Sequence, residues 1–313
     1  MVLKRGSKGA DVQKLQNGLA SLGYSVGNPD GIFGGKTEDA VEDFQEASDL
    51  LPDGIFGKGS MAAYNAKVAP EFRFAVAVQP DPPDLPPSQK NKWVTVPCHV
   101  GGGGFKTTTM RDDAAESFKA LYDEVTKLGG KLTSAGGKRA LSQGGGKAQS
   151  KTSMHYLGRA HDMALGAAMQ NPLKDVAVVC RRSPDKPWGE DRKWVVWLRT
   201  DNPAVPEITL QGVRCSTVNK KTVLKEIPVT GRFFNFTELA AKHGWTGISG
   251  RKTFFKGGGY TSAEWWHFQW EQGLVKGQTT FGSELLRLYS PAQCKALKWW
   301  DEVKDAVFGD DFV

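Results

Sequence analysis

The pentapeptide Asp-Gly-Ile-Phe-Gly occurs twice near the start of the chain, at Asp30–Gly34 and again at Asp53–Gly57. In each copy the aspartate can accept hydrogen bonds from nearby backbone amides, and the first glycine permits a positive φ. The isoleucine or phenylalanine that follows can then turn inward. We therefore predict two equivalent turns that close a small hydrophobic core.

Three amphipathic segments surround these turns. A first helix is expected from near Asp11 to Gly23, a second between the two pentapeptides and a third after the second pentapeptide. The apolar residues at helical spacing are Val12, Leu15, Leu19 and Leu22 in the first segment, Ala40, Val41 and Phe44 in the second, and Met61 and Tyr64 in the third.

A longer pattern joins these elements: Leu3-x-x-Gly6-x-x-Gly9-x-x-Val12-x-x-Leu15-Gln16, followed by the two pentapeptides. This pattern resembles the three-helix peptidoglycan-binding domain, a family common on cell-wall hydrolases. The resemblance implies an all-α domain over residues 1–70 that binds peptidoglycan. The same motifs could serve only to shape the fold, and they single out no individual binding residue.

A proline-rich stretch follows, with the sequence Q-P-D-P-P-D-L-P-P-S over residues 79–88. Prolines favour an extended, semi-rigid spacer, so we place a linker at residues 71–92. A tether of this kind would keep the following domain close to a polymer and raise its effective substrate concentration.

The remaining region, residues 93–313, mixes strand and helix patterns. An acidic start, one apolar face and Gly129 at the end predict a helix over residues 112–128. Runs of β-branched and aromatic residues predict strands at 93–96, 176–180, 193–199, 208–210 and 222–229. Further helices are expected over residues 236–243, 284–289 and 291–307.

Two short segments of this region carry the side chains of a hydrolytic metal site. Residues 153–162 read S-M-H-Y-L-G-R-A-H-D, and residues 264–267 read E-W-W-H. A catalytic zinc takes three protein ligands from His, Asp, Glu or Cys and keeps a fourth position for water, whose pKa the metal lowers. We expect His155, Asp162 and His267 to be the ligands.

Glu264 is the candidate general base, because it lies beside the third ligand without being one. It could take a proton from the zinc water and pass it to the leaving amine. On a regular strand Glu264 and His267 would point to opposite faces, so an extended segment needs a bend or bulge, whereas helical spacing would bring the two together. A reversal at Gly158 would let His155 and Asp162 converge.

The two motifs, Ser153-x-His155-x-x-Gly158-x-Ala160-x-Asp162 and Glu264-x-Trp266-His267, resemble the signature of the zinc D-Ala-D-Ala peptidases. This group includes the vancomycin-resistance D,D-peptidases and the L-alanyl-D-glutamate endolysins, and it shares a superfamily with lysostaphin-like enzymes and the hedgehog signalling domain. The resemblance covers the two motifs and their order. It implies an α+β zinc peptidase domain over residues 93–313, with a mainly antiparallel sheet and bound Zn²⁺.

In the resembling peptidases an arginine in a loop before the histidine motif holds the substrate or the oxyanion. Arg139 is the nearest candidate and Lys138 the next, because a guanidinium offers a fixed fork of donors. The family motif S-G-Y-R-S is replaced by S-A-G-G-K-R in this chain. The sequence is equally compatible with Arg139 being a solvated surface residue. His161 could replace Asp162 as a ligand in another register. The family pattern uses Asp162, so we interpret His161 as an outer or structural residue.

Composition sets outer limits. The chain has 313 residues, 39% hydrophobic and 24% charged, and contains no apolar run long enough to cross a bilayer. Its net charge of +7 is unevenly shared, because residues 1–78 hold eight basic and ten acidic residues and the remainder holds 33 basic and 24 acidic ones. A basic second half suits an anionic bacterial envelope; nucleic acid would be the competing partner, but no nucleic-acid motif is present. The four cysteines show no C-x-x-C spacing and are expected to be reduced.

These observations predict a monomeric peptidoglycan hydrolase that resembles a phage endolysin and cuts a bond in the stem peptide or cross-link. The first residues show no secretory signal, so we expect action on the wall after release from a host cytoplasm, or export by another route. The alternatives are a D-Ala-D-Ala carboxypeptidase and a zinc-containing wall-binding protein without catalysis. An inserted region around residues 181–230 could shape the substrate cleft.

Overall fold

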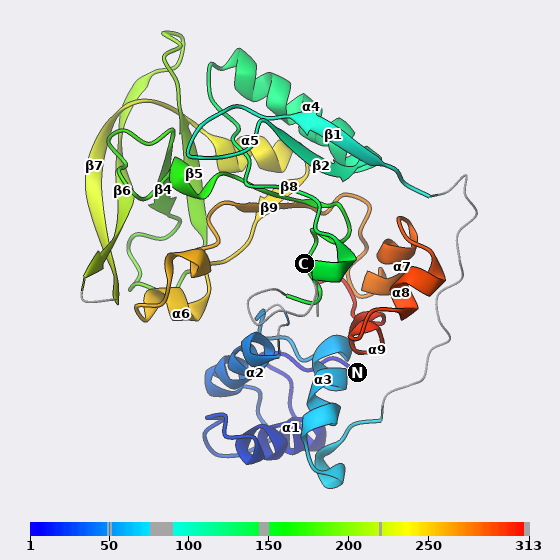
Figure 1. The fold of residues 1–313 in the computed structure, drawn as a ribbon. Coiled ribbons are helices and arrows are strands. Elements are labelled where there is room, and N and C mark those ends of the chain that lie inside the picture. Colours follow the sequence, from blue (N-terminus) through cyan, green and yellow to red (C-terminus); the bar gives the residue numbers. More distant parts are fainter. Residues whose placement is uncertain (49, 51, 76–89, 144–149, 219–220, 310–313) are drawn as a thin grey trace. The chain divides into compact units, whose positions relative to one another are not determined.

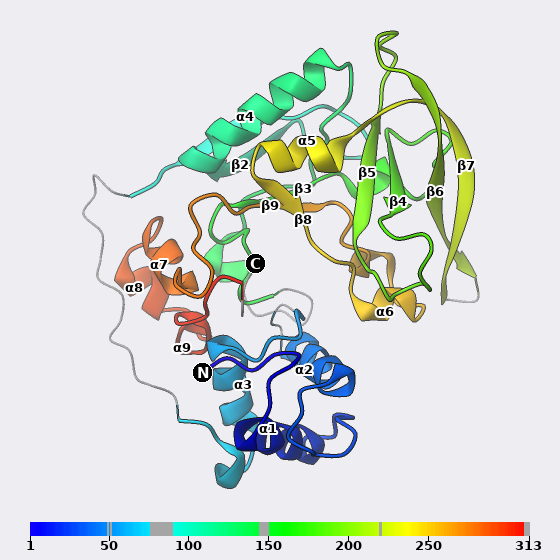
Figure 2. The same ribbon diagram turned by 180° about the vertical axis from the view of Figure 1, so that it is seen from behind.

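The computed structural model describes the chain except residues 49, 51, 76–89, 144–149, 219–220 and 310–313. The chain divides into two compact units (Figures 1 and 2). The first unit comprises Met1–Asn91, Arg139–Leu157 and Gly273–Val313, and the second comprises Lys92–Lys138 and Gly158–Gln272. Most of the expected linker, residues 76–89, lies outside the described residues. The division at residues 70 and 92 therefore stays a prediction.

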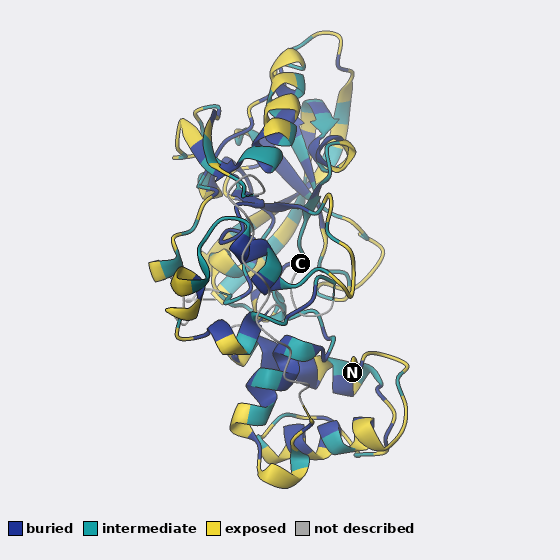
Figure 3. Ribbon diagram, turned by 90° about the vertical axis from the view of Figure 1, so that its right-hand side faces the viewer, coloured by how far each residue is buried: buried dark blue, intermediate teal, exposed yellow. Residues whose placement is uncertain are grey.

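The N-terminal part of the first unit is helical, as expected. It contains α1 (Ala10–Ser21), α2 (Gly35–Ala47), α3 (Lys58–Lys67) and the 3-10 helix η1 (Pro70–Phe72). One face of each α-helix is buried and the other is exposed, which Figure 3 shows in dark blue and yellow. The buried side chains include Val12, Leu15, Leu19, Phe33, Val41, Phe44, Phe56, Met61 and Tyr64.

The first pentapeptide turn is held by a buried glutamine of α1. Oε1 of Gln16 accepts a hydrogen bond from the backbone amide of Gly31 at 2.8 Å. Its Nε2 donates to Asp30 Oδ1, to the carbonyl of Ile32 and to Thr37 Oγ1, at 3.1, 3.1 and 3.0 Å. Gly31 has φ +73°, the positive value that the turn requires. One side-chain amide therefore joins α1, the turn and the start of α2.

The second turn repeats this arrangement one helix later. Oε1 of Gln45 accepts from the amide of Gly54 at 2.9 Å. Its Nε2 donates to Asp53 Oδ1, the carbonyl of Ile55 and Ser60 Oγ, at 2.8, 2.9 and 3.0 Å. The prediction of two equivalent turns is confirmed, and in each copy the phenylalanine rather than the isoleucine is buried.

The C-terminal part of the first unit differs from the expectation of two helices. It forms three short helices, α7 (Phe281–Leu286), α8 (Pro291–Lys295) and α9 (Trp300–Val303). The prediction of one helix over residues 291–307 is wrong, because α8 ends before two adjacent buried residues, Trp299 and Trp300. Successive positions of a continuous helix diverge around its axis, so a break lets both indoles pack inward. The segment 139–157 contributes η3 (Leu141–Gln143).

The second unit begins with a hairpin and a long helix. β1 (Trp93–Pro97) pairs antiparallel with β2 (Thr107–Arg111), and α4 (Asp112–Lys127) follows directly. The helix buries Phe118, Leu121 and Val125 against the main hydrophobic core of the unit. The predicted strand at 93–96 and helix at 112–128 are confirmed.

A three-stranded antiparallel sheet lies at the centre of this unit, in the order β3 (Ala160–Asp162), β9 (His267–Trp270) and β8 (Trp245–Gly247). The predicted helix at 236–243 is α5 (Phe236–Lys242), whose N-cap is the side chain of Asn235. The short elements η4 (Leu165–Ala167), α6 (Lys252–Phe255) and η5 (Tyr260–Ser262) complete the connections. The tryptophans around His267 are buried, as expected for core residues.

A second antiparallel sheet has four strands in the order β4 (Ala177–Arg181), β5 (Trp194–Arg199), β7 (Lys221–Asn235) and β6 (Glu207–Val218). It contains most of the expected insertion and has its own small core of Val178, Val229 and Phe233. β6 is longer than the strand predicted at 208–210, because its polar residues alternate with apolar ones along a half-exposed sheet. Among the described residues, no helix is long and apolar enough to cross a membrane.

Candidate metal centre

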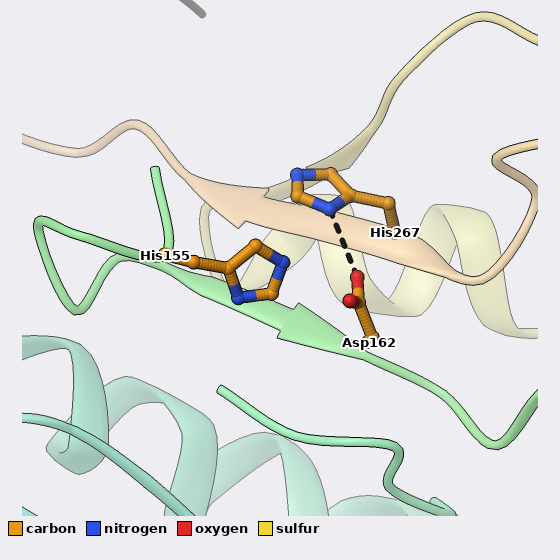
Figure 4. Close-up of side chains that lie close together, drawn as sticks. All are labelled: His155, Asp162 and His267. Atoms are coloured by element: carbon orange, nitrogen blue, oxygen red, sulfur yellow. Dashed lines mark hydrogen bonds and ion pairs between the residues drawn. The ribbon is translucent and has the colours of Figure 1, made fainter. Parts of the chain in front are cut away.

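The centre is built on the pairing of β3 with β9. In this antiparallel register Asp162 is the direct partner of His267, and such cross-strand neighbours bring their Cβ atoms within about 4.5–5.5 Å. Nδ1 of His267 lies 2.9 Å from Oδ1 of Asp162 (Figure 4). Two of the three predicted ligands are thus placed by the sheet itself, although 105 positions separate them in the chain.

The backbone around Asp162 is firmly held. Its amide donates to the carbonyl of Gly136 at 2.8 Å, and its carbonyl accepts from the amide of Ala135 at 2.6 Å. The next residue, Met163, donates to the carbonyl of Trp266 at 2.9 Å. These bonds fix the end of β3, and with it the direction of the carboxylate.

The third predicted ligand, His155, lies in the turns that precede β3. The amide of Tyr156 donates to the carbonyl of Ser153, and the chain then reverses at Gly158, which has φ +64°. A Cβ atom at Gly158 would lie 2.7 Å from the backbone nitrogen of Arg111. Both its conformation and its surroundings therefore require glycine, and the expected reversal is present.

The side chains of His155, Asp162 and His267 converge (Figure 4). One ligand atom from each residue lies within 4.8 Å of those of the other two, and among the described residues this is the one group of three or more potential ligands so arranged. Both imidazoles are buried and the carboxylate is half-buried. Two imidazole nitrogens and one carboxylate oxygen are ligand types that zinc takes in catalytic sites, so these three residues could hold such an ion.

Glu264, the predicted general base, lies outside this group, in a bend before β9 begins. Its φ is +55°, which is uncommon for a residue other than glycine. Its carbonyl accepts from the amide of His267 at 3.2 Å, and its Oε1 accepts from Nε of Arg251 at 2.9 Å. Of the arrangements left open by the E-x-x-H spacing, the structure has the bend.

Arg139 lies next to the segment that carries His155. Its amide donates to the carbonyl of His155 at 3.2 Å, and its guanidinium lies 5.5 Å from the ring centre of Tyr156. Burial raises the pKa of the Tyr156 hydroxyl despite the nearby Arg139 charge. Lys138, the second candidate, points elsewhere, because its ammonium lies over the ring of Trp93.

His161 occupies a different environment from the three candidate ligands. Its Nε2 lies 2.9 Å from the carbonyl oxygen of Thr133, and its ring packs at 4.6 Å from that of Phe118. It is 1% exposed and is not part of the converging group. This setting agrees with the interpretation of His161 as a structural residue.

Two arginines that contact residues in or beside the two motifs were missed by sequence reasoning. Arg251 pairs with Glu264 across thirteen positions, and a loop of that length gives no spacing signal. Arg159 lies inside the first motif, is 3% exposed and donates to the carbonyls of Trp270 and Gln272. The signal in the sequence that could have indicated its burial is its position between two small motif residues, Gly158 and Ala160.

The cysteines are not ligands of this centre. All four are free thiols, two buried and two half-buried. Burial raises the pKa of Cys98 to about 12, and burial with the nearby Glu226 raises that of Cys180 to about 12. Among the described residues, no cysteine belongs to the converging group.

Part of the chain has recognisable relatives. Residues 8–63 match the family model described as "Putative peptidoglycan binding domain". The N-terminal helical region is therefore a peptidoglycan-binding domain. A "Probable N-acetylmuramoyl-L-alanine amidase" of Bacillus licheniformis is 35% identical over 71 residues, 22% of this chain and 20% of that protein. The "Spore cortex-lytic enzyme" of Bacillus cereus is 43% identical over 56 residues, 18% of this chain and 22% of that enzyme. The chain thus matches about a fifth of the length of these relatives.

Two solved structures are also similar in part. A Burkholderia AP3 phage endolysin is 25% identical with a TM-score of 0.20, over 42% of this chain and 39% of the endolysin. A fused Zn-dependent amidase/peptidase/peptidoglycan-binding protein from Clostridium acetobutylicum is 16% identical with a TM-score of 0.22, over 72% of this chain and 81% of that one. These TM-scores are too low to indicate a shared fold.

Proposed function

We propose that this chain is a zinc-dependent peptidoglycan hydrolase that cleaves a peptide bond of the bacterial cell wall. The observation that carries the proposal is the convergence of His155, Asp162 and His267 within 4.8 Å. The peptidoglycan-binding domain at residues 8–63 supports the substrate class, because it would bring the chain to the wall polymer. The amidase and cortex-lytic names of the relatives point to the same class of substrate.

His155, Asp162 and His267 would hold the metal. Two imidazoles and one carboxylate form a ligand set used by catalytic zinc sites, and the burial of both rings limits competition from solvent. When bound, zinc supplies a water of lowered pKa and polarises the scissile carbonyl. A family assignment to the D-Ala-D-Ala peptidases rests on the same three residues with Glu264.

Glu264 would act as the general base and then as the general acid. Its carbonyl accepts a hydrogen bond from the amide of the candidate ligand His267, so one turn of the backbone holds the two residues together. A carboxylate there can accept a proton from the attacking water and donate it to the leaving nitrogen. Arg139, beside His155, would bind a substrate carboxylate or the developing oxyanion.

The bond to be cut is in the stem peptide or its cross-link, and we favour an endopeptidase that acts on L-Ala-D-Glu or on a D-Ala cross-link. Such cleavage dissolves the wall mesh, as an endolysin-like enzyme released from a host cytoplasm must do. Incubation of purified sacculi with the chain, followed by mass spectrometry of the soluble products, tests this directly. Release of free D-alanine alone would identify a carboxypeptidase instead.

Metal dependence and catalysis need separate controls. Chelator treatment should abolish release of fragments and one equivalent of Zn²⁺ should restore it. Glu264→Ala should bind sacculi and zinc but release no fragments. Glu190→Ala, which removes an exposed carboxylate between β4 and β5, should be fully active. Full hydrolysis by the chelated protein or by Glu264→Ala would defeat the proposal, and zinc binding without hydrolysis by the unaltered chain would leave a wall-binding protein.

A further inference from the structure

The loop before Glu264 is closed on itself by backbone contacts. The amide of Arg251 donates to the carbonyl of Ser262 at 2.9 Å, so the loop leaves and returns at neighbouring points. The amide of Gly250 donates to the carbonyl of Arg192 at 2.9 Å, which anchors the same point to the connection between β4 and β5. Arg251 is therefore fixed at the base of the loop, eleven residues before Ser262 in sequence but adjacent to it in space.

The bend at Glu264 is held from both sides. The carbonyl of Ala263 accepts a hydrogen bond from Nε1 of Trp194 at 2.7 Å, and Nε1 of Trp265 donates to the hydroxyl of Tyr260 at 2.9 Å. The hydroxyl oxygen of Tyr260 in turn lies 2.9 Å from the carbonyl oxygens of Leu165 and Ala168, either of which can accept its proton. Strained φ values persist where the surroundings over-determine them, and such positions cluster at functional sites. The backbone of Glu264 is such a position.

The side chain of Glu264 is restrained by one contact of Arg251. Nε of Arg251 donates to Oε1 of Glu264 at 2.9 Å. The other carboxylate oxygen, Oε2, accepts no hydrogen bond from the described residues. The two side chains are 27% and 13% exposed, so the charge-assisted bond is partly shielded from water. One carboxylate oxygen is thus held while the other can accept a proton.

We propose that Arg251 is the positioning residue for Glu264 in the hydrolysis. This inference rests on the proposed function, because it concerns the residue assigned as general base. Arg251 fixes the carboxylate through Oε1 and so presents Oε2 to the attacking water. Misplacement of a catalytic group by about 1 Å can cost about 100-fold in rate. Loss of the pair should therefore lower kcat and leave substrate binding unchanged.

The test compares Arg251→Met with a matched control, Arg182→Met, in the full zinc-loaded chain. Arg182 also uses Nε to contact a carboxylate, Oδ2 of Asp191 at 2.8 Å, but belongs to a surface turn between β4 and β5. A soluble stem peptide is the substrate, and kcat and KM are measured separately. Zinc content and thermal midpoint are recorded for every variant.

We expect Arg251→Met to lower kcat about 10- to 100-fold with KM changed less than about twofold and zinc content unchanged. Arg182→Met should keep the kcat of the unaltered chain. Arg251→Lys, which keeps the charge but loses the guanidinium fork, should give an intermediate kcat and serves as the measure if Arg251→Met fails to fold. A kcat for either Arg251 variant within twofold of the unaltered chain would overturn the inference, as would a loss expressed only in KM.

A double variant separates this inference from the proposed function. In a Glu264→Gln background, Arg251→Met should cause no further loss, because the group that Arg251 positions is already absent. A further 10-fold loss in that background would show that Arg251 acts on substrate or metal and would overturn its role as the positioning residue. Full activity of Glu264→Gln alone would instead remove the assigned base, and with it the proposed function.

Discussion

Gln16 and Gln45 occupy the same position before their respective turns and make the same four hydrogen bonds, to a glycine amide, an aspartate, an isoleucine carbonyl and a hydroxyl. Both side chains are at most 1% exposed. The internal repeat of the N-terminal domain is therefore a repeat of hydrogen-bond geometry as well as of sequence. In each half a single amide side chain holds a turn to two helices.

The first prediction concerns this glutamine. Gln45→Leu should destabilise the domain by about 2–4 kcal/mol, because several buried polar groups of the turn lose their partner. Gln13→Leu is the matched control, since Gln13 is exposed and makes one bond, to the carbonyl of Pro29. Calorimetric unfolding of the full chain should show a lowered transition for the first variant only. Equal midpoints for both would mean that the buried amide contributes nothing.

The second prediction concerns the metal. His155→Ala should weaken zinc binding by more than about 100-fold, since loss of an outer partner alone costs about 10- to 100-fold. His243→Ala is the control, because that imidazole pairs with Glu124 at 2.8 Å and is outside the converging group. Isothermal titration of the metal-free chain with Zn²⁺ measures both. Unchanged affinity in His155→Ala would remove this residue from the ligand set.

The third prediction separates backbone strain from steric clash at Gly158. Gly158→Ala must adopt φ near +64° and also place a Cβ 2.7 Å from a backbone nitrogen. Gly103→Ala has a similar φ of +77° but no atom within 4 Å of the new Cβ, so it should cost only about 1 kcal/mol. Gly158→Ala should lower the unfolding midpoint clearly more and reduce zinc affinity. Equal midpoints would mean that the surrounding chain moves aside without cost.

The fourth prediction concerns acid stability. Burial alone would raise the pKa of Asp113, but the hydrogen bonds and charge of Arg111 outweigh it and lower that pKa below the usual value. A carboxyl with a lowered folded-state pKa stabilises the protein above its unfolded pKa, about 3.9, and loses this contribution as the pH falls below that value. Thermal midpoints between pH 7 and pH 3 should therefore drop at the acid end.

Asp113→Asn tests the source of this acid sensitivity. The variant should lose the part of the pH dependence that comes from Asp113 and should be less stable at pH 7 by about 1.5–3 kcal/mol, because the buried guanidinium of Arg111 loses the half-exposed charge that it contacts at 2.6 Å. Asp185→Asn, on an exposed turn, should behave like the unaltered chain. If Asp113→Asn shows the same dependence of stability on pH as the unaltered chain, the acid sensitivity comes from other groups.

Much of the N-terminal domain was predictable, because its turns and helices are specified by short local patterns. The gathering of His155, Asp162 and His267 was also expected, although from motif resemblance, since no local rule predicts that β3 pairs with β9. The failures have one cause: sequence patterns report on residues close together in the chain, whereas these features depend on distant contacts. The break between α8 and α9 follows from the packing of two adjacent tryptophans, and the pairing of Arg251 with Glu264 depends on how a loop closes. Neither leaves a periodic signal in the sequence.

The facing positions of Asp162 and His267 have a consequence for how this chain can vary. The whole four-stranded sheet lies in the chain segment that connects β3 to β9. This segment can therefore lengthen or shorten without moving the side chain of Asp162 or of His267. A single residue inserted within β3 or β9 would be far more damaging than a whole hairpin added between them, because it would turn one of the two side chains to the opposite side of the sheet.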